Sequence, residues 1–105
     1  MRRGEVWWAD LPPPSGRRPV VLLSRDEAYS LREFVIMSPI TTRRRGLSTE
    51  VSLGPEEGLP KSCVANLDVI ITGPKASLKE RIGVLSSAKL RAVEASMRFA
   101  LGLED

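Results

Sequence analysis

Two short stretches of the chain bring arginine side chains together with hydroxyl groups. "GRRPV" places Arg17 and Arg18 directly before a buried apolar run, and "SPITTRRRG" places Thr41 and Thr42 at a strand end before three arginines. A guanidinium group binds phosphate through two parallel hydrogen bonds and stabilises negative charge that develops on it. If the two strands are neighbours, Arg18 and Thr41 converge on one phosphate, with the hydroxyl hydrogen-bonded to a phosphoryl oxygen.

Several other kinds of site are excluded by residue types that the chain lacks. It has no histidine and a single cysteine, Cys63, so it cannot form a Ser–His or Cys–His pair, a two-imidazole site for RNA cleavage or a zinc site. It also lacks the glycine-rich motifs that hold nucleotide phosphates. We therefore expect no metal and no cofactor, and we expect Cys63 to be a small buried apolar residue.

The positive charge is concentrated in the first part of the chain. The net charge is +3, but residues 1–45 contain nine arginines against five acidic residues, whereas residues 46–105 contain seven basic against eight acidic residues. All nine of the early cations are arginine, which both pairs with phosphate and stacks on bases. This balance favours a nucleic-acid partner, although charge alone also suits an ordinary soluble protein.

Short apolar or alternating segments, separated by loops rich in proline and glycine, predict a small sheet. About five strands are expected, over residues 5–10, 20–24, 34–40, 49–53 and 63–72. Residues 11–18 form a loop and residues 24–33 a polar connection. The chain is expected to form one domain over residues 1–105, mainly β, with the shape of a small barrel.

The last quarter of the chain changes to a helical period. Ser86 or Ser87 can cap the start of a helix and Gly102 can end it. The apolar residues that recur at helical spacing are Leu90, Val93, Met97, Ala100 and Leu101. No segment has the length of a membrane span or the pattern of a signal peptide, so we expect a cytoplasmic protein with no membrane contact.

Five sequence blocks in order, followed by the closing helix, resemble the MazF/PemK family of toxins in toxin–antitoxin systems. The blocks are "RGEVWWADLP", "RRPVVLLS", "VIMSPITT", "LPKSCVANLDVI" and "LKERIGVLS". The resemblance implies a small SH3-like barrel of the CcdB/PemK-like fold and a homodimer. It also implies a ribosome-independent endoribonuclease acting on single-stranded RNA, and a MazE-like antitoxin whose acidic C-terminal segment blocks the RNA groove.

The resemblance also implies how the site works. The family's catalytic arginine and threonine correspond to Arg18 and Thr41, and cleavage proceeds without metal by attack of the ribose 2′-hydroxyl, leaving a cyclic phosphate and a 5′-hydroxyl. Many relatives place a glutamate or glutamine in a longer loop before the arginine, but "PPPSGRR" contains neither. The general base is therefore unassigned; Glu5 and Asp10 are the nearest acids, and Asp10 is expected to form a turn at a strand end.

Other polar and aromatic side chains are candidates for contacts with RNA. Ser62 and Asn66 flank a strand start, where they either hydrogen-bond to bases or cap the strand. Trp7 and Trp8 are adjacent in a strand, so we expect one in the core and the other exposed on a base-stacking or dimer surface. The remaining candidates, which are either RNA contacts or a solvated charged turn in the case of the arginine triplet, are Arg17, Thr42, Arg43, Arg44 and Arg45.

Two other functions remain open from the sequence. CcdB-like proteins share the toxin fold but bind DNA gyrase and cut nothing, and a plain RNA-binding module would bind without cleavage. The gyrase poisons act through a bulky ending of the C-terminal helix, whereas this chain ends in "RFALGLED". The pairing of Arg18 with Thr41 favours cleavage over both alternatives.

Overall fold

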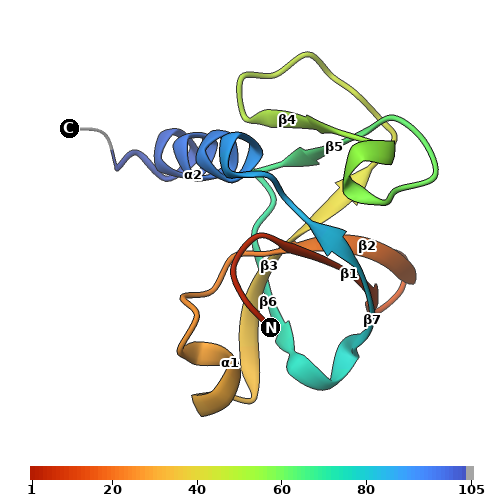
Figure 1. Ribbon diagram of the computed structural model, residues 1–105, viewed down its shortest axis with the longest axis vertical. Coiled ribbons are helices and arrows are strands. Elements are labelled where there is room, and N and C mark those ends of the chain that lie inside the picture. The colour runs from red at the N-terminus through yellow and green to blue at the C-terminus, as the bar shows by residue number, and fades with distance from the viewer. Residues whose placement is uncertain (104–105) are drawn as a thin grey trace.

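The computed structural model describes residues 1–103, and it is a curved antiparallel sheet of seven strands that forms half a barrel (Figure 1). The predicted mainly β fold with a C-terminal helix is confirmed, while residues 104 and 105 of the expected domain lie outside the described part. The strands are β1 (Glu5–Asp10), β2 (Arg17–Leu22), β3 (Phe34–Thr41), β4 (Glu50–Leu53), β5 (Cys63–Asn66), β6 (Ile71–Pro74) and β7 (Leu78–Val84). The helices are α1 (Ala28–Leu31) and α2 (Ser87–Leu101), with short 3-10 turns η1 (Pro55–Glu57) and η2 (Lys75–Ser77).

Strand β3 is the longest strand and connects the two parts of the sheet. The strand order is β4-β5-β3-β2-β1-β7, and β6 also pairs with β3. The first half of β3 pairs with β6, where Met37 lies opposite Ile71, and its end pairs with β5, where Thr41 lies opposite Val64. Because β3 changes partner along its length, the sheet curves around its C-terminal end.

The structure differs from the expected strands in the second half of the chain. The single strand predicted for residues 63–72 is two strands, β5 and β6, because the chain turns between them. The buried Ser38 hydroxyl holds this turn by donating to the carbonyl oxygens of Asn66 and Val69 at 3.0 and 2.8 Å. Strand β7 was not predicted, since its exposed Lys79–Arg81 segment lacks apolar alternation, and the polar connection 24–33 contains the short helix α1.

Strand β2 is buried on both faces, which explains its continuous apolar run. Val20 and Leu22 belong to one core cluster with Val35 and Met37, whereas Val21 belongs to a second cluster on the other face. Successive strand residues point to opposite faces, so a strand covered on both sides is apolar at every position. This strand therefore anchors the arginines that precede its apolar run.

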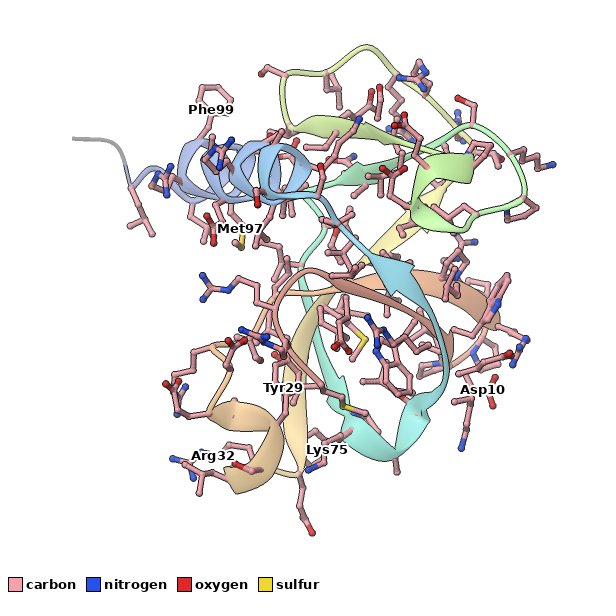
Figure 2. All side chains as sticks on the ribbon, in the orientation of Figure 1. Asp10, Tyr29, Arg32, Lys75, Met97 and Phe99 are labelled. Atoms are coloured by element: carbon pink, nitrogen blue, oxygen red, sulfur yellow. The ribbon has the colours of Figure 1, made fainter. Side chains whose placement is uncertain are left out.

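Helix α2 packs on the second cluster and has the predicted caps. The Ser86 hydroxyl accepts a hydrogen bond from the Lys89 N–H at 3.1 Å, and Gly102 ends the helix at a φ of 71°. Figure 2 shows Met97 and Phe99 on opposite sides of α2; Met97 packs against the core, whereas Phe99 is exposed. Leu101, expected on the apolar face, is 58% exposed. No helix in residues 1–103 is long and apolar enough to cross a membrane.

Candidate functional site

Strands β2 and β3 bring Arg18 and Thr41 together. The strands pair with Val20 opposite Pro39, and the same register continued by two residues sets Arg18 opposite Thr41. Both side chains line the same two adjacent surface hollows. The condition stated from the sequence, that the two strands be neighbours, is therefore met.

The two hollows differ in the chemistry of their walls. The first, here called the Trp8 hollow, has a volume of about 270 Å³ and an aromatic and apolar wall with a cationic rim, and the Arg17 guanidinium lies 4.9 Å above the Trp8 ring. Its lining is Trp8, Arg17, Arg18, Pro19, Ile40, Thr41, Thr42, Leu59, Pro60, Lys61 and Cys63. The second, here called the Arg43 hollow, has about 290 Å³ and is lined by Ser15, Arg18, Pro39, Thr41, Arg43, Arg45, Asn66 and Val69.

Positive charge is unbalanced in these hollows. Five basic side chains and no carboxylate line them. Two acids outside the lining pair with one of these cations: Arg17 lies 4.0 Å from Asp10, which is at the periphery of the molecule (Figure 2), and 3.7 Å from Glu80. The other four basic side chains have no acidic partner within residues 1–103. A surface of this kind attracts phosphate groups and offers no carboxylate as a general base.

The connection from β3 to β4 is ordered by its own hydrogen bonds. The Arg43 N–H donates to the Thr41 hydroxyl at 3.1 Å. The Arg44 guanidinium donates to the hydroxyls of Ser52 and Ser62 at 2.8 and 3.3 Å, so it is held away from the Arg43 hollow. Of the arginine triplet, only Arg43 and Arg45 line a hollow, where they join Arg18 and Thr41.

The two polar residues expected near the start of a strand occupy different positions. Ser62 binds Arg44 and, among the described residues, is not part of either hollow's lining. Asn66 lines the Arg43 hollow, but its side-chain oxygen accepts from the Thr49 hydroxyl and from the Asp68 N–H. The amide oxygen of Asn66 therefore supports the turn after β5.

The two tryptophans do not divide into one core and one exposed residue; both are half-buried. Trp7 packs against the core cluster that contains Val20 and Leu22, and its indole N–H donates to the buried Glu5 carboxylate at 2.8 Å. Trp8 lines the hollow named after it. Strand β1 lies next to the margin of the sheet, and its pairing with β7 is interrupted twice by register shifts. Neither face of β1 is therefore fully covered.

Comparison with known proteins identifies the family. The model of the family described as PemK-like, MazF-like toxin of type II toxin–antitoxin system matches residues 2–101. The chain belongs to this toxin family. Probable endoribonuclease MazF5 of Mycobacterium tuberculosis (strain H37Rv) is 39% identical over 100 residues, covering 94% of this chain and 91% of the relative.

Solved structures agree with the toxin fold. Mycobacterium tuberculosis toxin MazF-mt6 superposes with a TM-score of 0.89 at 31% identity and covers 96% of this toxin and 99% of its own chain. A mycobacterial endoribonuclease solved in complex with its cognate antitoxin superposes with a TM-score of 0.88 at 30% identity, covering 100% and 98% of the two chains.

Sequence reasoning missed the part of the toxin's groove that the loop after η1 contributes. Leu59, Pro60 and Lys61 line the Trp8 hollow. Their position depends on a close approach of backbones: Gly58 has a φ of 87°, and a Cβ there would lie 2.8 Å from the Ile82 carbonyl oxygen. The only sequence signal for Lys61 is a basic residue directly before Ser62.

Cys63 has the buried position predicted for it. Its side chain belongs to the second cluster and lines the Trp8 hollow, and the thiol donates to the Leu53 carbonyl oxygen at 3.7 Å. Burial raises the pKa of this thiol, and the Glu57 carboxylate raises it further, against the opposing effect of Arg44. The cysteine is therefore a neutral packing residue.

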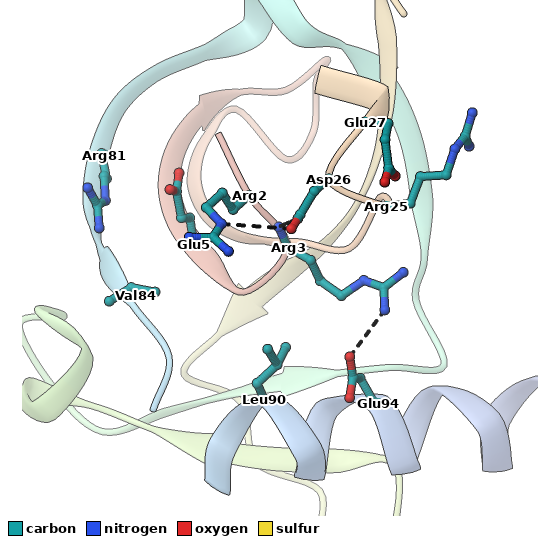
Figure 3. Close-up of a pocket in the computed structure, with 10 residues that line it drawn as sticks. All are labelled: Arg2, Arg3, Glu5, Arg25, Asp26, Glu27, Arg81, Val84, Leu90 and Glu94. Atoms are coloured by element: carbon teal, nitrogen blue, oxygen red, sulfur yellow. Dashed lines mark hydrogen bonds and ion pairs between the residues drawn. The ribbon is translucent and has the colours of Figure 1, made fainter. Parts of the chain in front are cut away.

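A larger cavity of the toxin lies elsewhere and is balanced in charge. It has a volume of about 510 Å³ and is bordered by the N-terminal segment, the turn before α1, β7 and α2 (Figure 3). Its four arginines face four carboxylates, and Arg3 donates to Glu94 on α2 at 3.1 Å, while Arg2 lies 3.7 Å from Asp26. These pairs join the N-terminal segment to the rest of the fold, so the two smaller hollows remain the better candidate site.

Proposed function

We propose that this toxin is an endoribonuclease that cleaves single-stranded RNA between the Trp8 hollow and the Arg43 hollow. The observation that carries the proposal is that Arg18 and Thr41 line the wall common to two hollows with five basic side chains and no carboxylate. A phosphate placed on this wall leaves one neighbouring nucleotide for each hollow. The relatives named endoribonucleases support the activity.

The proposed reaction uses the RNA's own hydroxyl as nucleophile and needs no metal. The ribose 2′-oxygen attacks phosphorus and loses its proton to solvent water, the bond from phosphorus to the 5′-oxygen breaks, and that oxygen takes a proton from water and leaves as a 5′-hydroxyl. The other product is a 2′,3′-cyclic phosphate. Arg18 stabilises the negative charge that builds up on the phosphoryl oxygens. Thr41 accepts from the Arg43 N–H, so its own hydroxyl proton is available for a phosphoryl oxygen.

Binding is assigned to the groups around this centre. A base stacks in the Trp8 hollow, where Trp8, Arg17 and Lys61 offer an aromatic ring and cations. The RNA backbone follows Arg43 and Arg45 through the other hollow, where Asn66 is a polar contact, and Thr42 is a polar contact in the Trp8 hollow.

The proposed partners follow from the same charge and from the family. We expect a cytoplasmic homodimer whose cationic groove also attracts the acidic segment of a MazE-like antitoxin. A relative that is 30% identical has been solved with its cognate antitoxin, which supports such a pairing. An antitoxin segment lying in this groove would exclude RNA directly.

The deciding experiment is incubation of the purified protein with a long single-stranded RNA in the presence of a chelator, followed by mapping of the cut ends. We expect defined fragments with 5′-hydroxyl and cyclic-phosphate ends. Binding without cleavage would overturn the proposal in favour of an RNA-binding module. Inhibition of DNA gyrase by a protein that leaves RNA intact would overturn it in favour of a CcdB-like poison.

A further inference from the structure

A single carboxylate at the start of β4 holds three consecutive backbone amides of the arginine-rich loop. Glu50 accepts from the N–H of Arg45 and of Gly46, each at 2.9 Å, and from the N–H of Leu47 at 3.2 Å. The Glu50 N–H donates in turn to the Leu47 carbonyl oxygen at 3.1 Å. The side chain thus closes the loop onto the first residue of the strand that follows it.

Gly46 makes this arrangement possible. Its φ of 73° lies in the left-handed region, which side chains other than glycine rarely adopt. Alternation of backbone conformation around such a residue turns successive N–H groups toward one point and creates a concave anion site. Here the anion in that site is the toxin's own Glu50 carboxylate.

The loop backbone needs these hydrogen bonds because its charged side chains repel one another. Arg43, Arg44 and Arg45 are adjacent like charges, and the loop belongs to no strand or helix between Thr41 and Glu50. Arg44 is fixed by Ser52 and Ser62, whereas Arg43 and Arg45 have no side-chain partner within residues 1–103 and line the hollow beside Arg18. Ordering of these two side chains in the free protein therefore depends on the backbone between them and β4.

We propose that Glu50 is a positioning residue, which fixes the loop backbone so that Arg43 and Arg45 face the RNA groove without itself touching RNA. This rests on the proposed RNA-cleaving function. Since the backbone is ordered before RNA arrives, the RNA does not bear the entropy cost of ordering it.

The ionisation of Glu50 is consistent with this role. Partial loss of solvent raises the pKa of Glu50, but the N–H groups of Arg45, Leu47 and Gly46 and the charge of Arg44 outweigh it, so the pKa lies below its ordinary value. Glu50 is therefore a full carboxylate acceptor at neutral pH.

The proposal predicts an effect opposite in sign to that of simple charge. A Glu50→Gln variant removes a negative charge beside the groove, which by itself strengthens binding of anionic RNA. If Glu50 positions the loop, the same variant weakens RNA binding, since an amide cannot serve as acceptor to three N–H groups as a carboxylate does. The matched control is Glu56→Gln, because Glu56 is exposed and has no hydrogen-bond or ion-pair partner within the described residues.

The experiment combines hydrogen exchange with steady-state cleavage of an RNA oligonucleotide. In Glu50→Gln we expect faster exchange at the amides of residues 45–47 and a KM raised about tenfold, roughly the cost of ordering one residue's backbone, with kcat nearly unchanged. Glu56→Gln leaves the exchange and the KM as in the wild type or lowers the KM slightly. Thermal unfolding verifies that each variant is folded.

A second variant removes the same arrangement without changing charge. Gly46→Ala disfavours the left-handed conformation and should raise KM in the same direction as Glu50→Gln. Gly102→Ala is its control, since Gly102 also has a positive φ but lies at the end of α2 and has open space around it. This pair decides the question even if Glu50→Gln does not fold.

Three results would overturn the inference while leaving the proposed function in place: a KM for Glu50→Gln equal to or below that of Glu56→Gln, unchanged exchange at residues 45–47, or faster exchange with an unchanged KM. A wild-type protein that cleaves no RNA would instead remove the proposed function, and the inference with it.

Discussion

At the residue scale, Arg18 has the most demanding role, because it is the cation on the wall shared by both hollows beside Thr41. We predict that Arg18→Ala reduces kcat by about 10²–10³, the usual effect of removing one hydrogen-bond donor to developing charge. The fold should survive, since the residue is only half-buried near the start of β2 and its guanidinium has no partner among the described residues.

The measurement is the cleavage rate of an RNA oligonucleotide at saturating concentration, with thermal unfolding followed in parallel. Arg91→Ala on the exposed surface of α2 is the matched control and should cleave at the wild-type rate. Cleavage by a folded Arg18→Ala protein within a few-fold of the wild type would contradict the role given to this arginine.

Tyr29 gives a prediction about pH, and it is the only tyrosine of the chain. Its hydroxyl is buried near Ser24 without a hydrogen bond of ordinary geometry in residues 1–103, and burial raises its pKa from 10.0 to about 12 against the lowering effect of Ser24. The unfolded chain loses the phenolic proton near pH 10 while the folded protein retains it. The free energy of unfolding therefore falls as pH rises from 10 to 12, by roughly 2–3 kcal/mol.

Ultraviolet absorbance titration of the folded protein measures this pKa directly. In a Tyr29→Phe variant the free energy of unfolding should fall less between pH 10 and 12, because the variant has no phenolic proton to lose. Ionisation near pH 10 in the folded wild type would mean that the hydroxyl reaches solvent.

Residue types alone were enough to predict the centre of the candidate site, but not its margins. Arg18 and Thr41 stand out because each precedes or ends an apolar run, and the pairing of those runs places them opposite one another. Lys61 follows η1, and the position of that loop depends on the close approach of Gly58 to Ile82 in β7, so its neighbours along the chain do not place it in the site. The fixed side chain of Arg44 was equally hidden, because its serine partners lie in β4 and before β5.

At the element scale, the connection between β3 and β4 contains two kinds of arginine. We predict that Arg43→Gln combined with Arg45→Gln weakens RNA binding strongly and flattens the dependence of log K on log salt by about 1.4, or about 0.7 for each phosphate group that is no longer neutralised. Arg44→Gln should leave that slope unchanged, since its guanidinium is occupied by Ser52 and Ser62.

Fluorescence anisotropy across a series of salt concentrations tests both variants on one catalytically inactive background. Equal slopes for the double variant and the wild type would show that Arg43 and Arg45 do not bind phosphate groups and belong to a solvated charged turn. A flattened slope for Arg44→Gln would show that its side chain leaves the serines to bind RNA.

The crossing of η1 and β7 gives a prediction about stability. A Cβ at Gly83 would overlap the Glu57 carbonyl oxygen, so Gly83→Ala must push the η1 loop away from β7. We expect the free energy of unfolding to fall by about 1–3 kcal/mol, as for other overpacked sites, and the KM for RNA to rise because Lys61 moves with the loop.

Gly73→Ala in β6 is the matched control, because a Cβ there meets only the Met37 methyl at 3.6 Å. Chemical denaturation of the two variants measures the difference. Equal free energies of unfolding for the two variants would contradict the prediction, because they would show that the crossing of η1 and β7 accommodates the Cβ without loss of stability.

An element was predictable from the sequence where its residues keep one pattern of burial along its whole length. Where that pattern changes within a segment, the prediction failed. The run in β2 and the helical period of α2 each reflect one continuous environment, so both were found. The stretch 63–72 passes from β5 through a turn into β6 on another partner, which an apolar pattern cannot reveal. Charged residues in β7 face solvent at the margin of the sheet, so its pattern is that of a loop.

At the scale of the whole molecule, the small core leaves much apolar surface exposed. Ten large apolar side chains in residues 1–103 are at least 40% exposed, among them Met1 and Val84 near the N-terminal segment. We predict a homodimer at micromolar concentration, with an interface that uses this segment and part of the sheet. Val84→Asp should then weaken it, since a charge would be buried between the two copies.

Sedimentation velocity over a range of concentrations measures the dimerisation constant. Phe99→Asp on the opposite side of α2 from the core is the control and should leave the constant unchanged. A strict monomer that still cleaves RNA would remove the dimer from the mechanism.

The pairing of β1 with β7 has a consequence during translation. Glu5 lies opposite Val84, so the first strand to leave the ribosome cannot complete its pairing until the last strand has been made. A nascent chain interrupted before residue 78 lacks β7, which is one of the two neighbours of β1 and also supports η1, whose following loop contributes to the wall of the Trp8 hollow. We therefore expect such fragments to be inactive, so that the toxin becomes active only after the final strand and helix have been synthesised.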